Sequence, residues 1–246
     1  MSAFKTVQRM EERVGKLIAE FSECLNVFDG AQLFTGPSLY FHFKTLRIRG
    51  KYTTTVDTLN DDDFYDSLYA TLTAWGMHRM GAVNTKLVEM DKIKESFHRQ
   101  AEQIRQVEAY TLSKLEKSQV GQATDQLWQI IAGLKIGVGE TKIVANSKAL
   151  HHLLPSLMPP IDREYTIRFF YHHKTLKKED NERAFREIYP YFHQIATACK
   201  GQIQKRVTAR QGMDTSETKV IDNAIVGYVR KYLPKKKANN SSDDLD

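Results

Sequence analysis

The sequence predicts a mainly α-helical protein, and three observations support this fold class. Apolar residues recur at three- and four-residue spacing along almost the whole chain, which is the period of an amphipathic helix. The sequence shows no β-α-β alternation of strands and helices and no internal repeat. The composition, with 41% hydrophobic and 27% charged residues, is that of a globular protein.

The length of 246 residues is sufficient for a substantial core and a cleft. We expect one helical domain over residues 1–237, built either as one bundle or as two lobes around a cleft. Residues 238–246 are rich in Asn, Ser and Asp, which predicts a disordered tail.

The elements of the first third follow in order. An apolar face from Val14 to Leu25 predicts a first long helix. Residues 38–49 fit both a strand and a helix, and the flanking proline and glycine favour the helix. A third helix begins near residues 60–63, whose acidic side chains suit a helix N-terminus, and it continues to Trp75.

Two long helices are predicted in the remainder. Residues 91–117 are highly charged and carry a narrow apolar stripe, so this helix should lie on the surface. Residues 179–207 predict a helix that is bent or broken at Pro190. The other predicted helices span residues 122–134, 147–154, 161–172 and 218–232.

The charge favours a polyanionic partner. The formal net charge is +6 and the pI is near 9.1. Lys and Arg gather in the C-terminal half, after residue 162, which is next in sequence to the candidate site described below. The alternative interpretation is a solvated basic face that has no partner.

Other classes of protein find no support in the sequence. No apolar run approaches the roughly 20 residues needed to cross a bilayer, and the polar N-terminus lacks a signal-peptide core. Cys24 and Cys199 lie in apolar helical patterns, as reduced core cysteines do. The sequence has no glycine loop of the P-loop or Rossmann kind. We expect a cytoplasmic protein without a membrane partner or a cofactor.

The run Gly137-Val138-Gly139 predicts a turn between two helices that could bind a phosphate. Glycine accepts positive φ and allows a close approach, so backbone N–H groups can converge on an anion. A second register, from Ala145 to Lys148 at the start of the next helix, has a similar composition. The sequence does not decide between the two registers.

The run Pro159-Pro160-Ile161-Asp162-Arg163 delivers one carboxylate to a helix start. Asp162 has two interpretations there. It could cap the free N–H groups of the helix. It could also stabilise the positive charge that develops on a sugar ring when a base–sugar bond breaks, since a helix N-terminus favours the ionised carboxylate. A folded-back Arg163 would favour the ionised form as well.

These runs resemble the core of the helix-hairpin-helix DNA glycosylases, over roughly residues 127–170. The resemblance implies that Asp162 is the catalytic carboxylate and that Gly137, Gly139 or their neighbours bind a DNA phosphate. The predicted DNA contacts are Gly137, Gly139, Lys142, Ser147, His152 and Arg163.

The sequence departs from that family in three ways. The segment between the glycines and Asp162 is longer, and a four-cysteine cluster for an iron–sulfur centre is absent. In members with lyase activity a hairpin lysine attacks the sugar. Here Lys142 and Lys148 lie near that position but neither is in register, so Lys148 is interpreted as a phosphate contact or a nucleophile. The chain also resembles a bacterial protein group that carries the runs 71–81 and 147–152, a resemblance that implies no activity.

A glycosylase must extrude its base into a pocket with aromatic walls and a few hydrogen-bonding groups. Trp75, His78 and Arg79 are predicted to supply that pocket, because the run is polar where a buried helix should be apolar. Tyr165 is a further candidate. The alternative is a core tryptophan beside solvated polar neighbours.

Two other polar features find structural explanations. The histidines at 151–152, 172–173 and 193 lack a third ligand at metal spacing, so no metal site is predicted. Asp222 and Asn223 stand beside apolar positions of the last helix, where they either tie helices together or brace the site wall.

Together these features predict a monofunctional DNA N-glycosylase. It would extrude a modified or damaged base and hydrolyse the N-glycosidic bond with the help of Asp162, in DNA repair or in defence against phage. The alternatives are a non-catalytic nucleic-acid-binding helical protein and a protein-interaction scaffold that uses residues 91–117. The sequence determines neither the base nor the oligomeric state.

Overall fold

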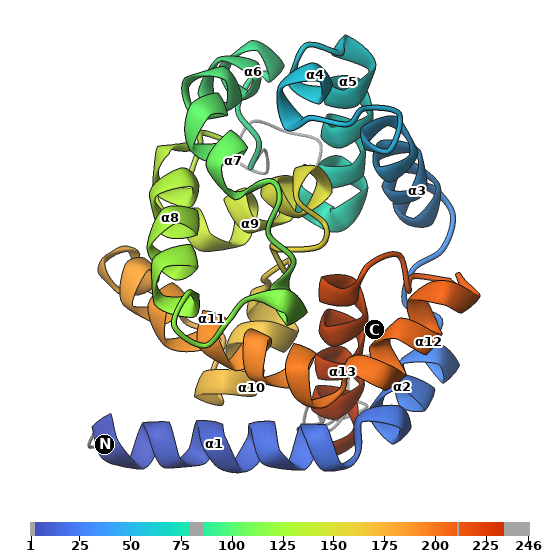
Figure 1. Cartoon of the computed structure of the whole chain (residues 1–246), viewed down its shortest axis with the longest axis vertical. Coiled ribbons are helices and arrows are strands. Elements are labelled where there is room, and N and C mark those ends of the chain that lie inside the picture. Colours follow the sequence, from blue (N-terminus) through green and yellow to red (C-terminus); the bar gives the residue numbers. More distant parts are fainter. Residues whose placement is uncertain (1–2, 79–85, 211, 234–246) are drawn as a thin grey trace, which may run out of the picture.

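The computed structural model describes residues 3–78, 86–210 and 212–233, and these fold almost entirely into helices (Figure 1). The predicted mainly α class is confirmed. Within the described ranges the β pairing is one isolated antiparallel bridge, between Leu87 and Gly137. Arg79 and the predicted tail 238–246 lie outside the described residues.

The first predicted helix is in fact two helices, α1 (Ala3–Ala19) and α2 (Phe21–Gly30). Glu20 leaves the helical conformation, with φ −112° and ψ 26°. The resulting turn lets α1 lie along one edge of the molecule while α2 runs beside the C-terminal helix (Figure 1). Both apolar faces are thereby buried, which one straight helix could not achieve.

The ambiguous segment is helical, as its flanking residues favoured. Helix α3 (Pro37–Arg49) is followed by α4 (Thr55–Leu59) and α5 (Asp62–Leu72). Asp61 caps α5 and accepts the N–H of Asp63 at 2.9 Å. A buried hydroxyl cluster joins α3 to α5, in which Thr45 Oγ1 lies 2.8 Å from Ser67 Oγ and 2.8 Å from Thr71 Oγ1.

The predicted long surface helix over 91–117 is wrong. The chain forms α6 (Met90–Arg99), α7 (Ala101–Val107) and the short helical turn η3 (Leu112–Lys114). It turns at Gln100, where φ is −98° and ψ is 2°. The turn brings the whole apolar stripe into the core, because Ile93, Phe97, Ile104 and Leu112 are all at most 2% exposed. The scaffold interpretation thereby loses the extended helix on which it depended.

The central segment places the candidate site. Helices α8 (Val120–Gly133) and α9 (Lys142–Leu153) are joined by residues 134–141. Helix α9 begins five residues earlier than predicted. The turn η4 (Arg163–Ile167) and helix α10 (Arg168–Tyr171) follow the double proline, close to the predicted range.

The last third contains α11 (Asn181–Ala198), α12 (Lys200–Ala209) and α13 (Glu217–Tyr232). Pro190 does not break the helix. It lies inside α11 on the exposed side, where water can satisfy the carbonyl that loses its partner. The break comes instead at Cys199, with φ −103° and ψ 15°.

Helix α13 is buried at every residue from Thr218 to Val229. It packs most closely on α2 at Gly227. A Cβ at Gly227 would overlap the carbonyl oxygen of Cys24 and lie 2.7 Å from its carbonyl carbon. Cys24 and Cys199 are both free and buried, as predicted. The largest cluster of core residues extends from Met10 to Val229.

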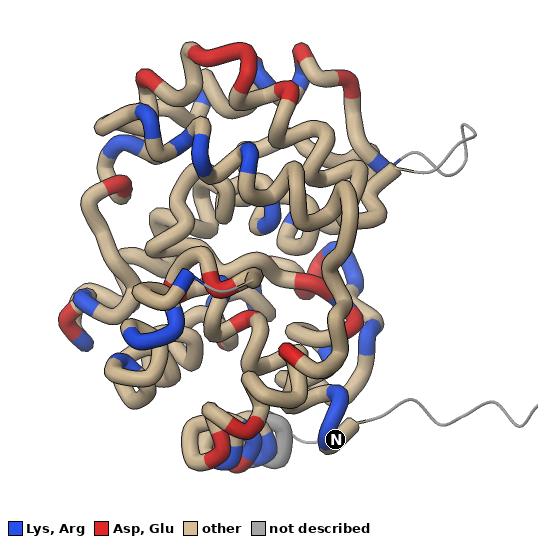
Figure 2. The backbone as a smooth tube through the Cα atoms, turned by 90° about the vertical axis from the view of Figure 1, so that its right-hand side faces the viewer, with Lys and Arg blue, Asp and Glu red and all other residues tan. Residues whose placement is uncertain are grey.

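The charge distribution is less one-sided than the sequence indicates (Figure 2). Several basic residues of the C-terminal half are paired locally, as in Lys178–Glu140, Arg206–Asp29 and Lys231–Glu23. A binding argument must therefore start from the local site. No helix within the described ranges is long and apolar enough to cross a membrane.

Candidate active site

The glycine run lies in the loop between α8 and α9, as predicted, but its backbone conformation differs from the predicted one. Neither takes a positive φ. Gly137 is needed because a Cβ would lie 3.1 Å from the Lys86 carbonyl oxygen. The N–H of Val138 donates to that same oxygen at 2.9 Å. The expected positive φ is therefore wrong, and this loop is joined to residues 86–88. The phosphate contact of the loop stays a prediction.

The second register holds the fold together as well. Ser147 is buried and its Oγ accepts the N–H of Ile161 at 3.0 Å, which ties α9 to the double-proline segment. His152 is also buried. Neither side chain is accessible to DNA, so these two predicted contacts are wrong. Lys142 is half-buried and donates to the Leu134 carbonyl at 3.4 Å.

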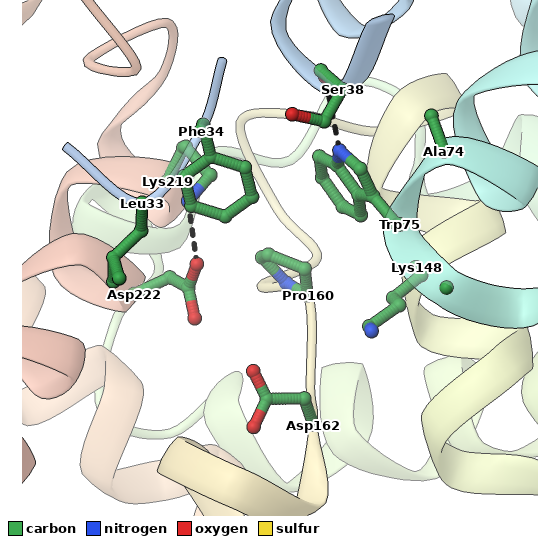
Figure 3. A pocket seen from close by; sticks show the side chains of 11 residues that line it. Leu33, Phe34, Ser38, Ala74, Trp75, Lys148, Pro160, Asp162, Lys219 and Asp222 are labelled. Carbon is green, nitrogen blue, oxygen red and sulfur yellow. Dashed lines mark hydrogen bonds and ion pairs between the residues drawn. The ribbon is translucent and has the colours of Figure 1, made fainter. Parts of the chain in front are cut away.

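Asp162 performs the predicted capping and also faces a cavity. Its Oδ1 accepts the N–H of Tyr165 at 2.6 Å, and its extended backbone precedes η4. The side chain remains half-buried and lines the cavity (Figure 3). The two sequence interpretations of this residue are therefore compatible, because one carboxylate oxygen is sufficient for the cap.

The cavity has a volume of about 350 Å³. This is at the lower end of the range for small-molecule sites. Its walls come from five segments of the chain: the loop after α2, the start of α3, the turn that follows α5, the α9–η4 region and α13. The lining residues are Leu33, Phe34, Ser38, Ala74, Trp75, Gly76, Lys148, Pro160, Asp162, Lys219 and Asp222.

Trp75 forms an aromatic wall of the cavity. It lies in a π-helical turn, η1 (Thr73–Met77), which is kinked at Trp75 and Gly76. Gly76 adopts φ +81°, a conformation that favours glycine, so the chain can turn sharply there. The indole N–H donates to the Ser38 carbonyl at 3.2 Å, and the ring centroid lies 6.0 Å from that of Phe34.

Lys148 is half-buried at the cavity edge, with Nζ 5.9 Å from the Trp75 ring centroid. The structure thus brings together three residues predicted from separate motifs, Trp75, Lys148 and Asp162 (Figure 3). They are separated by 73 and 14 positions in the sequence.

Other predicted site residues lie elsewhere. His78 is exposed and does not line the cavity, and Arg79 is not described. Tyr165 packs against the core, including a small cluster around Phe28, and is not a cavity wall. Arg163 donates to Thr141 Oγ1 at 3.2 Å, so it does not fold back on Asp162. Among its described members, the predicted base pocket thus retains Trp75 alone.

Sequence analysis missed Lys219 as a site residue. It predicted for Asp222 only a tie between helices or a brace of the site wall. Lys219 is buried, and its Nζ donates to Asp222 Oδ2 at 2.7 Å and to Asn223 Oδ1 at 2.5 Å. The same Nζ lies 4.9 Å from the Phe34 ring centroid. The available signal was the i, i+3, i+4 spacing of three polar residues on an otherwise apolar helix.

The cavity therefore contains two carboxylates and two ammonium groups in different environments. Burial raises the pKa of Asp222 above its ordinary value, and the charge of Asp162 adds to this, while Lys219 and Lys148 oppose it. Asp162 is more exposed, and its Oδ1 accepts a backbone N–H at a helix start. Such a site can hold a polar planar group and stabilise positive charge near Asp162.

Three buried histidines lie behind Trp75. His42 Nδ1 lies 3.0 Å from His152 Nε2, and His42 Nε2 lies 3.0 Å from Thr215 Oγ1. His152 Nδ1 faces the Lys148 carbonyl at 2.8 Å, so it carries a proton and leaves Nε2 to accept from His42. His151 stacks on His42 at a centroid distance of 6.1 Å. In the part of the chain that the structure describes, no group of His, Cys, Asp and Glu side chains could hold a metal ion.

The histidine cluster predicts a loss of stability in mild acid. Burial lowers the pKa of His152 to about 4. Below about pH 6.5 the unfolded chain therefore binds a proton at this residue that the folded protein does not bind until the pH is much lower. Between pH 7 and pH 5, His152 alone should lower the free energy of unfolding by about 2 kcal/mol. Denaturant unfolding at several pH values gives the free energy of unfolding of the wild type and of His152→Gln. The free energy of the variant should fall less steeply between pH 7 and pH 5.

The exposed His173 provides the matched control for this measurement. The variant His173→Gln should show the same decline between pH 7 and pH 5 as the wild type. An identical pH dependence for His152→Gln and the wild type would contradict the prediction.

Comparison with known proteins gave no relatives: no family model, no curated protein and no solved structure matches the chain.

Proposed function

We propose that the protein is a monofunctional DNA N-glycosylase that hydrolyses the bond between a modified or damaged base and its deoxyribose. The observation that carries the proposal is the position of Asp162, a helix-capping carboxylate that is still open to a cavity with an aromatic wall. The helix pair α8–α9, the double proline and the capping Asp162 follow in the order that helix-hairpin-helix glycosylases have, and this is the finer fold that we propose.

The chemistry fits the charges of the site. Breaking an N-glycosidic bond builds positive charge on the sugar, and a fixed carboxylate nearby stabilises that charge more in the transition state than in the ground state. Asp162 is held by the N–H of Tyr165, so it does not need to reorganise during the reaction. A water that attacks C1′ completes the hydrolysis.

The cavity walls suit an extruded base. Trp75 and Phe34 offer π faces for stacking, and the polar side chains opposite them can hydrogen-bond a base edge (Figure 3). The two rings are 6.0 Å apart and inclined at 53°, so they form one continuous wall and do not sandwich the base. The volume of about 350 Å³ accommodates one nucleoside-sized ligand.

Lys148 has the position of a phosphate contact in this proposal. It is at the cavity edge and none of the described residues forms a salt bridge with it, so its charge remains available to DNA. A lysine in the hairpin, the usual nucleophile of lyases, would be Lys142, whose Nζ instead donates to Leu134. We therefore propose hydrolysis without lyase activity.

The direct test is to incubate the protein with genomic DNAs that carry different base modifications. Mass spectrometry of the released bases identifies the substrate, and strand breaks are measured with and without alkali. Free base with breaks only after alkali supports a monofunctional glycosylase. Salt-sensitive binding without any base release would support the alternative, a non-catalytic nucleic-acid-binding protein.

A phosphate contact by Lys148 predicts a smaller salt dependence of DNA binding. Each neutralised phosphate contributes a slope of about −0.9 in a plot of log K against log salt concentration for duplex DNA. The variant Lys148→Gln should bind duplex DNA more weakly at low salt and reduce the slope by about 1, as fluorescence anisotropy titrations would show. The exposed Lys92 of α6 gives the control Lys92→Gln. An unchanged slope for Lys148→Gln would remove Lys148 from the DNA interface.

A further inference from the structure

Asp222 lines the same cavity as Asp162, and both carboxylates extend into it (Figure 3). Its side chain is 9% exposed, and Oδ2 accepts from Lys219 Nζ at 2.7 Å. Within the described residues no hydrogen bond reaches the other oxygen, Oδ1. Oδ1 is not fully buried, and Asp222 lines the cavity, so this oxygen can meet a group that enters there.

The position of Asp222 is fixed from behind. Lys219 also donates to Asn223 Oδ1 at 2.5 Å, and Asn223 in turn donates to the Met213 carbonyl at 3.2 Å and to Asp214 Oδ1 at 2.9 Å. This network holds Lys219 in one place, and Lys219 holds Asp222. A carboxyl that is fixed in this way needs little reorganisation to act on a ligand.

We propose that Asp222 is the general acid of this site, which gives a proton to the base as the base leaves, and that Lys219 is its positioning residue. This inference rests on the proposed glycosylase function. It extends that function, because the sequence and the family resemblance offered one carboxylate whereas the geometry points to two with different tasks.

The reaction balances with water as the only co-reactant. The bond between C1′ and the base nitrogen breaks, and the base keeps the electron pair and takes the proton from Asp222. The positive charge left on the sugar faces Asp162 until the oxygen of a water bonds to C1′. That water releases a proton to the solvent, and Asp222 regains one from the solvent. The net change is one water consumed, with a free base and an abasic sugar formed.

The surroundings of the two carboxylates suit a division in which Asp222 donates the proton and Asp162 stabilises the positive charge. Charged groups face Asp222 from three segments: Lys219 on its own helix, Asp162 before η4 and Lys148 on α9. The neighbouring helix α2 contributes the Phe28 ring to the environment of Lys219, and its Asp29 is paired with Arg206 of α12. Burial and Asp162 favour the protonated form of Asp222, and this effect is opposed by the two lysines. Asp222 lies in a buried environment that favours its protonated form and Asp162 at a more exposed helix start, so the first can act as the acid and the second as the charge stabiliser.

The test measures single-turnover base release against pH, on the genomic DNA that releases most base with the wild-type protein. We expect the wild-type rate to fall as pH rises through the pKa of Asp222. The variant Asp222→Asn should be slower by about 10²- to 10⁴-fold at low pH and should lack that descending limb. In Lys219→Met, Asp222 loses its nearest positive charge, so the limb should move to higher pH. A merely structural role of Lys219 would lower the rate without moving the limb.

Folding is controlled in parallel by circular dichroism and thermal unfolding. The double variant Lys219→Met/Asp222→Asn removes both buried charges together, so it tests the loss of the acid without leaving an unpaired ammonium. The matched control Asp61→Asn changes a carboxylate remote from the cavity and should keep the wild-type profile.

The outcomes separate the two proposals. If no DNA releases a base with the wild type, the glycosylase function fails. If the wild type releases a base but Asp222→Asn or the double variant keeps its rate and its descending limb, Asp222 is not the acid and the glycosylase function stands. A limb that stays in place in Lys219→Met would remove Lys219 from the mechanism.

Discussion

Replacing Asp162 by Asn should reduce base release by at least about 10³-fold while the protein still folds and binds DNA. Asn and Asp are comparable helix N-caps, so the bond to the Tyr165 N–H survives the change. What is lost is the negative charge that would face the sugar in the proposed reaction. The substitution therefore separates the structural task of this residue from its chemical one, and base release measured by mass spectrometry reports the second.

The same substitution at Asp61 is the control for this experiment. Asp61 caps α5 and accepts the N–H of Asp63 at 2.9 Å, so it has the same structural task without a cavity beside it. Asp61→Asn should leave base release unchanged. A second probe that needs no known base is duplex DNA with a cationic pyrrolidine in place of one deoxyribose, because it carries the charge that the transition state develops.

The wild type should bind the pyrrolidine duplex more tightly than a duplex with a neutral abasic analogue, and Asp162→Asn should lose this preference. Release at the wild-type rate by Asp162→Asn would falsify the assignment of the catalytic carboxylate. Equal affinities of the wild type for the two duplexes would argue against a positively charged transition state in this cavity.

Replacing Gly227 by Ala should destabilise the protein by about 3 kcal/mol or more. The new methyl group would overlap the backbone of Cys24 in α2, and a carbonyl in a helix cannot rotate away as a side-chain end can. Helices α2 and α13 would have to separate along their contact. Chemical denaturation measures the change, and the midpoint should fall without a change in helix content at zero denaturant.

Gly201 in α12 and Gly121 in α8 provide the controls. A Cβ at either position would meet no atom within 4 Å, so alanine should be tolerated there. Because alanine has the higher helix propensity, the free energy of unfolding should stay the same or rise by up to about 1 kcal/mol. A loss in these variants as large as in Gly227→Ala would show that helix contact is not the cause.

The extent to which the sequence predicted the site depends on how local each signal is. Asp162 was identified because a double proline and a capping carboxylate lie within a few residues. Trp75 was identified because a polar run interrupts an apolar helix. Lys219 and Asp222 join the cavity only through the packing of α13, more than 50 residues after Asp162, and no spacing in the sequence encodes that contact.

The errors in the fold have a related cause. Helical periodicity reports that residues are helical and have one apolar side, but it does not report where the axis turns. Glu20 and Gln100 are ordinary helix residues by composition, and the chain bends at both because the core lies on two sides of each segment. The burial of His152 likewise follows from the packing of α3. His42 of that helix is the hydrogen-bond partner of His152 Nε2, although the sequence predicted that His152 contacts DNA.

The cavity joins residues that lie far apart in the sequence, with Leu33 and Phe34 from the loop after α2 and Lys219 and Asp222 from α13. During synthesis on a ribosome the walls before residue 163 emerge first, and the site stays open on one flank until α13 has left the exit tunnel. The proposed activity would thus be absent from the nascent chain. The same order means that a messenger truncated before α13 would yield a product that lacks Lys219 and Asp222 and therefore one wall of the cavity.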